Sequence, residues 1–154
     1  MEITLLAVGR LRPAYRAACD DYVRRIGRHL RFTEVEVREA SRAPTLAAQR
    51  AEEAGRLRSR LPPGATLVCL ARDGTPWSSE ELARRLGRWR EEARPLAFAI
   101  GGSSGIDESL LGAAAARWSL GPATLPHELA RVVVVEQIYR GFTILRGEPY
   151  HKGR

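Results

Sequence analysis

The stretch LAFAIGGSSG, residues 96–105, joins a wholly apolar run to a glycine-rich loop. An apolar run without alternation is typical of a strand that is buried on both faces of a parallel sheet. Because glycine carries no Cβ, the loop that follows lets a ligand approach the main chain closely. We therefore expect a buried strand that ends beside a ligand. The alternative is a plain turn into a helix that Asp107 caps.

Strand-like and helix-like segments alternate on both sides of this stretch. The apolar spacing predicts strands at residues 3–8, 32–37, 65–71, 96–100 and 118–120. It predicts helices over residues 15–30, 46–61, 78–89, 107–116 and 127–145. This alternation indicates an α/β fold with a mainly parallel sheet and helices on both faces.

The length and composition favour one folded domain. A chain of 154 residues that is 44% apolar fits one compact domain, residues 1–154. No apolar run approaches the roughly 20 residues of a membrane span, and the first residues lack the layout of a signal peptide. Cys19 and Cys69 are isolated from each other, so we expect no disulfide, no metal site and a cytoplasmic location.

The charge of the chain is strongly basic. The net charge is +7, and residues 1–60 hold 13 arginines against 8 acids. The sharpest cluster is Arg24, Arg25, Arg28, His29 and Arg31. Such an excess favours a polyanionic partner such as RNA. Because only one of the 25 basic residues is a lysine, a compositional bias toward arginine is the alternative.

The segment 127–145 reads as a helix with a wide apolar stripe, although the valines at 132–135 would also suit a strand. Glu136 and Arg140 are spaced to pair on its polar side. The stripe is wider than one core face needs, so part of it is expected to bury against a second subunit. Arg131 interrupts the stripe, and a charge there needs a partner or a ligand. We expect a functional role for Arg131, with a structural ion pair or a surface arginine as the alternatives.

Two further segments have the composition of a ligand site. Residues 118–127, WSLGPATLPH, combine irregular backbone with aliphatic side chains, which suits a flat heterocycle. They follow a strand, as the glycine-rich loop and Leu70 do, and ligands collect at the carboxyl ends of parallel strands. Neither a G-x-G-x-x-G loop nor a P-loop is present, so NAD- and ATP-dependent enzymes are disfavoured. The terminal residues 149–154, PYHKGR, are either a frayed tail or part of an active site.

Taken in order, these motifs resemble one family over essentially the whole chain. The resemblance rests on Val8-Gly9, Leu70, Gly74-x-Pro76-Trp77, Ile100-Gly101-Gly102-x-x-Gly105, Trp118-Ser119-Leu120, Thr124-Leu125-Pro126-His127, Arg131, Glu136-Gln137-x-Tyr139-Arg140 and Pro149-Tyr150-His151. The chain is similar to the ribosomal RNA large subunit methyltransferase H family, small SPOUT methyltransferases. It departs from the family at Ser103-Ser104, where relatives often carry a proline and an acid, and at Ala71-Arg72-Asp73, which is less typical.

The resemblance implies an α/β fold with a C-terminal trefoil knot, a homodimer, and S-adenosylmethionine as cofactor. It places the cofactor against a set of eight residues: Leu70, Gly101, Leu120, Gly121, Pro122, Ala123, Thr124 and Leu125. The expected partner is large-subunit (23S) rRNA or the ribosome, with no membrane and no metal.

The implied reaction is methylation at N3 of a pseudouridine, which must lose its imide proton. His151 is the candidate base, because an imidazole titrates near neutrality. Tyr150 can stack on the nucleobase. Arg131, together with Lys152 and Arg154, can hold phosphates or stabilise the developing charge. The alternatives are a related knotted methyltransferase that acts on tRNA or another rRNA site, and a non-enzymatic RNA-binding module.

Overall fold

The computed structural model describes residues 1–152, without the side chain of His151. Its strands are β1 (Glu2–Val8), β2 (Arg31–Val37), β3 (Thr66–Pro76), β4 (Leu96–Ile100) and β5 (Ala116–Ser119). Its helices are α1 (Pro13–Ile26), α2 (Leu46–Ser59), α3 (Ser79–Glu92), α4 (Glu108–Leu111) and α5 (His127–Leu145). A 3₁₀ turn, η1 (Pro149–Lys152), follows α5.

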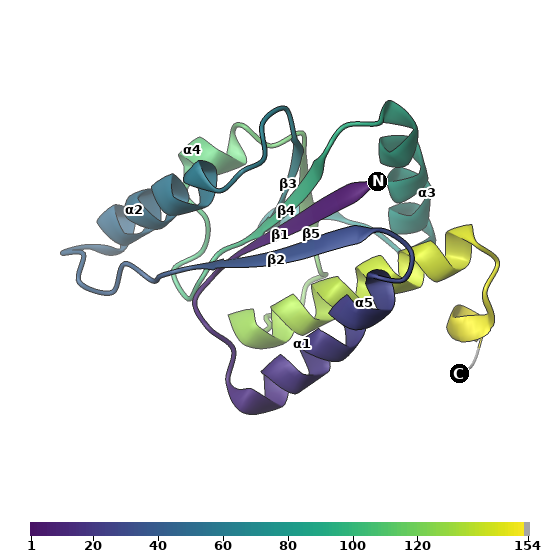
Figure 1. Ribbon diagram of the computed structural model, residues 1–154. Coiled ribbons are helices and arrows are strands. Elements are labelled where there is room, and N and C mark those ends of the chain that lie inside the picture. Colours follow the sequence, from purple (N-terminus) through teal and green to yellow (C-terminus); the bar gives the residue numbers. More distant parts are fainter. Residues whose placement is uncertain (153–154) are drawn as a thin grey trace.

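The five strands form one sheet in the order β2-β1-β4-β3-β5 (Figure 1). Every pairing is parallel, which confirms the predicted α/β class and goes further than the expected mainly parallel sheet. The apolar run at residues 96–100 is the middle strand, β4, and all of its residues are buried. All carboxyl ends of the strands therefore lie along one edge of the sheet.

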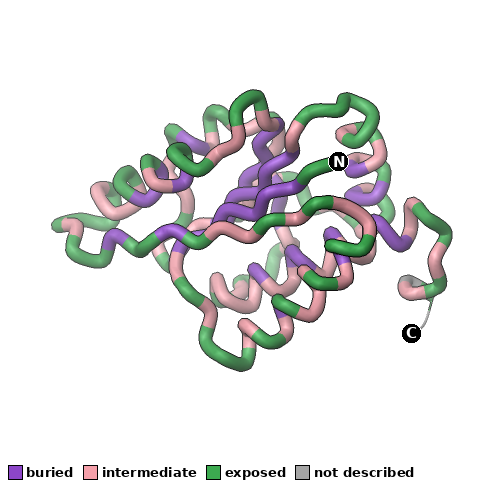
Figure 2. Tube along the Cα trace, viewed as in Figure 1, coloured by how far each residue is buried: buried purple, intermediate pink, exposed green. Residues whose placement is uncertain are grey.

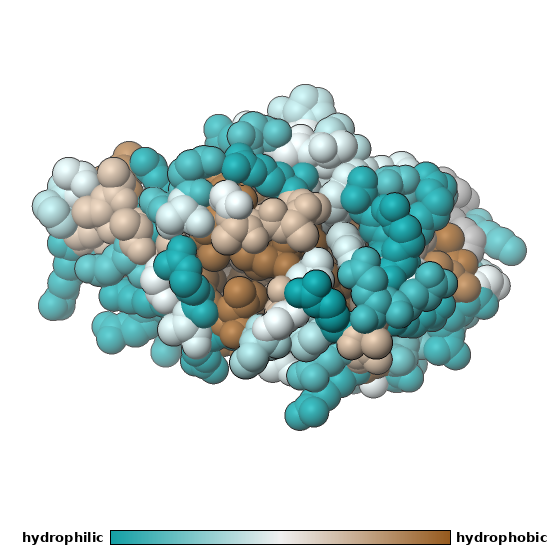
Figure 3. Space-filling model, turned by 90° about the horizontal axis from the view of Figure 1, so that it is seen from above, coloured by the Kyte–Doolittle hydropathy of each residue, from teal (hydrophilic) through white to brown (hydrophobic). Residues whose placement is uncertain are grey.

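Helices cover both faces of the sheet, as predicted. Alternate strand residues divide into two cores, because successive side chains of a strand point to opposite faces. Phe98 of β4 packs with residues of α1, α3 and α5, whereas Ala97 and Ala99 pack with residues of α2 and α4. The strands are the most continuously buried part of the chain (Figure 2). Seen from the side of α2 and α4, apolar residues gather in a central hollow ringed by hydrophilic side chains (Figure 3).

Side-chain caps fix several helix starts. The hydroxyl of Ser78 accepts a hydrogen bond from the Glu81 amide. Asp107 accepts one from the Ser109 amide, which is the cap that the sequence indicated. Thr45 caps α2 in the same way. α2 then ends at Ser59, two residues before the predicted end at 61.

The segment after Asp107 corrects a prediction. We expected an alanine-rich helix to about residue 116, but α4 ends at Leu111 and Ala116 opens strand β5. The Ala115 amide already donates to the Leu67 carbonyl at 2.8 Å. The open edge of β3 thus supplies backbone partners that override the helix propensity of alanine. The strand predicted at 118–120 is consequently β5, two residues earlier and ending at Ser119.

β3 is longer than the predicted strand at 65–71. It continues to Pro76, with an irregularity in its pairing with β5 between Leu70 and Thr75. Residues 71–74 therefore bulge from the sheet at its carboxyl edge. Within residues 1–152, no helix has the length and apolar character needed to cross a membrane.

Candidate functional site

A cavity of about 930 Å³ opens at the carboxyl ends of β3, β4 and β5. Three chain segments form most of its wall: residues 70–73, 100–106 and 118–127. These follow the three strand ends that the sequence analysis had singled out. All eight residues that the resemblance assigns to a cofactor line this one cavity: Leu70, Gly101, Leu120, Gly121, Pro122, Ala123, Thr124 and Leu125.

The glycine-rich loop folds back on itself at the floor of the cavity. Gly102 and Gly105 form a bridge, and Gly105 has a φ of +83° that favours glycine. A Cβ placed on Gly101 would lie 2.6 Å from the backbone carbon of Gly105. Only a glycine at position 101 allows the loop to close in this way.

A buried carboxylate supports this loop from behind. Glu53 of α2 is 1% exposed, and its oxygens accept hydrogen bonds from the Ala40 amide at 3.0 Å and the Ser104 hydroxyl at 3.3 Å. Arg50 donates to the Ser104 carbonyl at 3.4 Å. No cation pairs with Glu53 among the residues that the structure describes. Glu53 thus ties α2 to the loop through neutral donors.

Sequence reasoning missed Glu53. The available signal was an acid four residues before the apolar Leu57, on the face of α2 that also carries Ala54. Buried carboxylates are rare without a partner, so a charge on that face marks a contact or a function.

The segment after β5 stays irregular and contributes an apolar wall. The Ser119 hydroxyl accepts a hydrogen bond from the Gly121 amide at 3.1 Å, and Gly121 has a φ of +112°. Leu120 and Leu125 are half-buried, whereas the residues between Gly121 and Leu125 are exposed. Main-chain amides and carbonyls in this segment therefore remain open to a ligand beside aliphatic side chains.

Arg131 lies one residue beyond the cavity wall and points away from it. Its side chain is buried, and one guanidinium nitrogen contacts Glu34 at 3.0 Å and Glu36 at 2.5 Å. The other nitrogen donates to the Gly9 carbonyl at 2.9 Å. This is the structural ion pair that the sequence left open as an alternative. Through it, the start of α5 is held to the carboxyl ends of β1 and β2.

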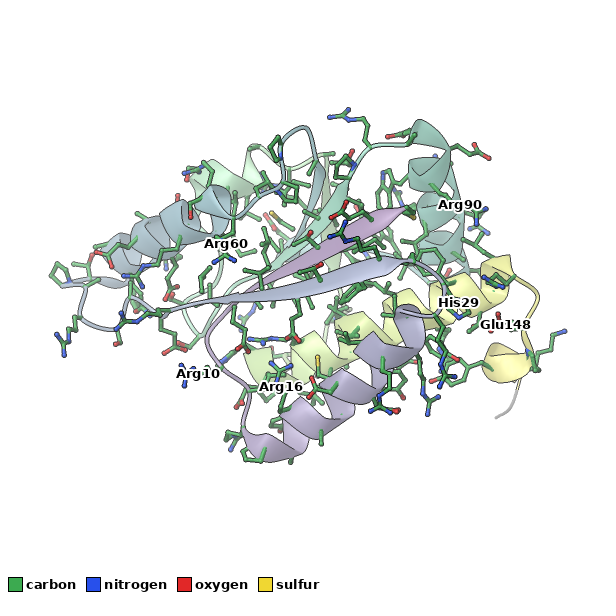
Figure 4. The ribbon with its side chains drawn as sticks, in the orientation of Figure 1. Arg10, Arg16, His29, Arg60, Arg90 and Glu148 are labelled. Atoms are coloured by element: carbon green, nitrogen blue, oxygen red, sulfur yellow. The ribbon has the colours of Figure 1, made fainter. Side chains whose placement is uncertain are left out.

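Arg16 of α1 completes this network. It contacts Glu34 at 2.7 Å and Glu36 at 2.7 Å, and Figure 4 shows it beneath the sheet near Arg10. The hydrogen bond that Arg16 donates to Glu34 is the main cause that raises the pKa of Arg16 above its ordinary value. The two carboxylates of β2 thus neutralise two arginines from two helices.

Tyr150 lies at the other end of α5, outside the cavity. Its hydroxyl is 3.1 Å from Glu136 Oε1 and 3.4 Å from the Tyr22 hydroxyl, and its ring meets Tyr139 edge to face. Burial, followed by the hydrogen bond with Tyr22, raises the pKa of Tyr150 above its ordinary value. The predicted pair of Glu136 and Arg140 is confirmed, at 2.7 Å. His29, beside Glu148 in Figure 4, stacks on Tyr139 in the same cluster.

Of the proposed catalytic residues, the structure describes the side chains of Tyr150 and Arg131, and these two do not lie together. Arg131 binds groups of β2 and of the residue after β1, and Tyr150 packs on α1 and α5 of the same chain. The side chain of His151 and the whole of Arg154 lie outside the described residues. The cofactor residues that the resemblance assigns share a cavity, whereas Tyr150 and Arg131 do not contribute to its wall.

Neither cysteine lines the cavity. Burial raises the pKa of both Cys19 and Cys69 to about 12, so both thiols stay protonated at neutral pH. Within residues 1–152, no group of three His, Cys, Asp or Glu side chains is arranged to hold a metal ion.

Comparison with known proteins places this geometry in a family. Residues 1–151 match the family described as "Predicted SPOUT methyltransferase". A ribosomal RNA large subunit methyltransferase H from Anaeromyxobacter sp. is 44% identical over 153 residues, which cover 99% of this chain and 100% of that protein. The protein of the same name from Pseudomonas paraeruginosa is 39% identical over 155 residues, again covering 99% and 100%. The chain belongs to the SPOUT methyltransferase family.

Proposed function

We propose that this protein transfers a methyl group from S-adenosylmethionine to N3 of a pseudouridine in large-subunit rRNA. The observation that carries the proposal is the cavity at the carboxyl edge, where the glycine-rich loop and residues 120–125 meet. The names of the full-length relatives, both large-subunit rRNA methyltransferases, support the substrate class. The C-terminal trefoil knot implied by the resemblance is part of the same proposal.

The residues of the cavity fit an adenosine-containing cofactor. Aliphatic side chains at positions 70, 120 and 125 offer flat apolar contacts, and the open backbone around Gly121 offers hydrogen-bond partners to a purine edge. The first turns of α2 and α5 also line the cavity, and a helix amino end favours a carboxylate. When bound, S-adenosylmethionine supplies an electrophilic methyl group. The chain itself must orient the nucleobase and accept its proton.

His151 is the residue we assign to the proton. An imidazole titrates near neutrality, so it can take up a proton at physiological pH. Tyr150 is unsuited to that step, because its raised pKa keeps the phenol protonated. A protonated phenol can still stack on the base or donate to its carbonyl groups.

As long as Tyr150 stays docked on Glu136 and Tyr22, the tail can act in catalysis only on a second subunit. The Glu136 that holds Tyr150 lies about 14 Å along α5 from His127, at 1.5 Å per residue. Val132 and Val133 of α5 remain half-exposed within one chain. A homodimer that covers these valines would bring the tail of one subunit to the cavity of its partner. A monomer by sedimentation at micromolar concentration would rule out this arrangement.

Calorimetric titration with S-adenosylmethionine tests the cofactor, with ATP and NAD as controls. Micromolar binding of the methyl donor alone is expected. Methylation mapping of rRNA and tRNA after incubation with the enzyme then tests the substrate. A product on tRNA, or at another rRNA site, would replace the proposed substrate and keep the cofactor.

The assignment of His151 has its own test. His151→Ala should lower turnover by roughly 10²–10⁴-fold with cofactor and rRNA saturating, the usual contribution of a general base. Turnover near the wild-type rate would show that another group, or water, takes the proton.

A further inference from the structure

Three arginines stand at the carboxyl edge of the sheet without an acceptor for their side chains in residues 1–152. Arg10 follows β1, Arg38 follows β2, and Arg72 lies in the bulge of β3. All three are exposed. We call them the edge arginines. Some exposed arginines of the chain, such as Arg12 and Arg56, contact a carboxylate, whereas others, such as Arg60 and Arg90, have no acceptor in residues 1–152 and lie away from this edge.

The fold sets the edge arginines in a row. Val8 pairs with Val37, and the Gly9 amide donates to the Val37 carbonyl at 2.8 Å, so Arg10 and Arg38 leave adjacent strand ends. β4 separates β1 from β3, and Arg72 lines the cavity itself. Adjacent strands lie about 4.8 Å apart, so the row spans roughly 15 Å and ends at the cavity.

Acidic side chains do little to cancel this charge. Glu36 is bound by Arg16 and Arg131, Asp73 by Arg117, and Glu128 by Arg12. Among the described residues of this edge, Glu39 alone is an exposed carboxylate without a cation. Arg42, also exposed, lies beside it in the loop before α2. The edge therefore keeps a positive potential next to the cavity.

We propose that the edge arginines bind the phosphates of a single-stranded RNA segment that crosses the mouth of the cavity. The proposal rests on the function proposed above and adds where the substrate strand runs. Phosphate contacts fix the register of a strand without reading its sequence. A strand held along this row would present one unstacked nucleobase to the cavity. The basic cluster at residues 24–31, which the sequence analysis singled out, lies toward the opposite edge, where β2 begins.

Salt-dependent binding of a short unstructured RNA oligonucleotide tests the row. The variants are R10Q/R38Q and R10Q/R38Q/R72Q. The matched control is R60Q/R88Q/R90Q, three exposed arginines without an acceptor among residues 1–152, and Figure 4 shows Arg90 at the opposite end of the molecule from Arg10. Each phosphate contact to a single strand contributes about 0.7 to the slope of log affinity against log salt. The double variant should thus lose about 1.4 from the slope and the triple variant about 2, while the control keeps the wild-type slope.

Two results would contradict the proposal that the edge arginines bind RNA phosphates. Equal losses in the edge and control variants would show that RNA responds to overall charge. An unchanged slope in the triple variant would show that RNA binds elsewhere. Thermal unfolding verifies that each variant is folded, and R10Q/R38Q should bind S-adenosylmethionine as wild type does. Failure of the wild type to bind S-adenosylmethionine would contradict the proposed function, whatever the RNA result.

Discussion

The two ends of helix α5 differ in whether their polar groups already have partners within the chain. At its amino end, residues 120–127 are irregular and apolar, carry no acidic or basic side chain except the imidazole of His127, and border an open cavity. At its carboxyl end, the ring of Tyr150 packs edge to face on Tyr139, and Glu136 forms an ion pair with Arg140. The first end leaves main-chain groups open for a ligand. The second is closed within a single chain, so its residues can reach a substrate only by leaving that cluster or by carrying it to another subunit.

The arginine at each end makes the difference quantitative. Arg131 should be far more important to stability than Arg140, because Arg131 is buried and Arg140 is partly exposed, with side-chain exposures of 2% and 24%. Arg131→Met removes the charge-assisted hydrogen bonds to Glu34, Glu36 and the Gly9 carbonyl but leaves Arg16 on both carboxylates, so it should cost about 1.5–3 kcal/mol. Arg140→Met should cost about 1 kcal/mol or less. Urea unfolding of both variants measures the contrast, and similar midpoints would contradict it.

Gly101 tests whether the open end depends on close backbone packing. A Cβ at position 101 would meet the Gly105 backbone at 2.6 Å, so Gly101→Ala must displace the loop. We expect a loss of about 1–3 kcal/mol of stability and severely weakened cofactor binding. Gly55→Ala is the control, because its Cβ meets nothing within 4 Å on helix α2. That variant should be as stable as wild type or up to about 1 kcal/mol more stable.

Glu53 tests whether the open end needs support from α2. Glu53→Leu is similar in size and removes both acceptor oxygens, so the hydrogen bonds from the Ala40 amide, the Gln49 side chain and the Ser104 hydroxyl are lost. A loss of about 1–2 kcal/mol is expected, together with weaker cofactor binding. The control is Glu52→Leu, because Glu52 is the neighbouring residue but is exposed and paired only with Arg56; it should change stability by less than about 1 kcal/mol. Equal effects of the two substitutions on unfolding and on calorimetric titration would remove Glu53 from this role.

A substitution of Tyr150 tests whether the carboxyl end of α5 is buried within a single chain. Its pKa is raised by burial, so the neutral phenol stabilises the folded state below about pH 10, the ordinary tyrosine value, and this contribution disappears as pH rises through the higher folded value. Absorbance at 295 nm should therefore show a late-titrating tyrosine that is missing in Tyr150→Phe. The substitution itself should cost about 1 kcal/mol or less below that pH. If the phenol that is missing from the Tyr150→Phe titration ionised near pH 10 in the wild type, Tyr150 would lie in solvent.

The sequence predicted much of the fold because its signals were local. The strands at 3–8, 32–37 and 96–100 carry apolar patterns that do not depend on distant residues. The meeting of residues 70, 101 and 120 followed from one rule, that parallel strands share a carboxyl edge. The helix that we extended to residue 116 failed because the edge of β3, far away in sequence, competes for the same backbone.

The site was less predictable where contacts are remote. Arg131 was recognisable as a charge that needed a partner, but Glu34 and Glu36 lie more than 90 residues earlier. The contact of Glu53 with Ser104 joins residues that are 51 apart. The contact of Tyr150 with Tyr22 joins residues that are 128 apart, and the sequence around each tyrosine does not indicate that the two meet. No periodicity reports such pairs, because each depends on the finished packing of helices on the sheet.

The strand order has a consequence for how the protein is made. β4, the middle strand, is fourth in the chain, so β1 and β3 gain their shared neighbour only after residue 100 has been synthesised. A nascent chain must then keep the apolar residues of β1 and β3 uncovered through most of translation, and α5 seals that core last. Long-range parallel pairing is slow, and the apolar surface that stays exposed meanwhile is prone to aggregation. Chaperone dependence during synthesis is therefore expected to exceed what the stability of the finished domain would suggest.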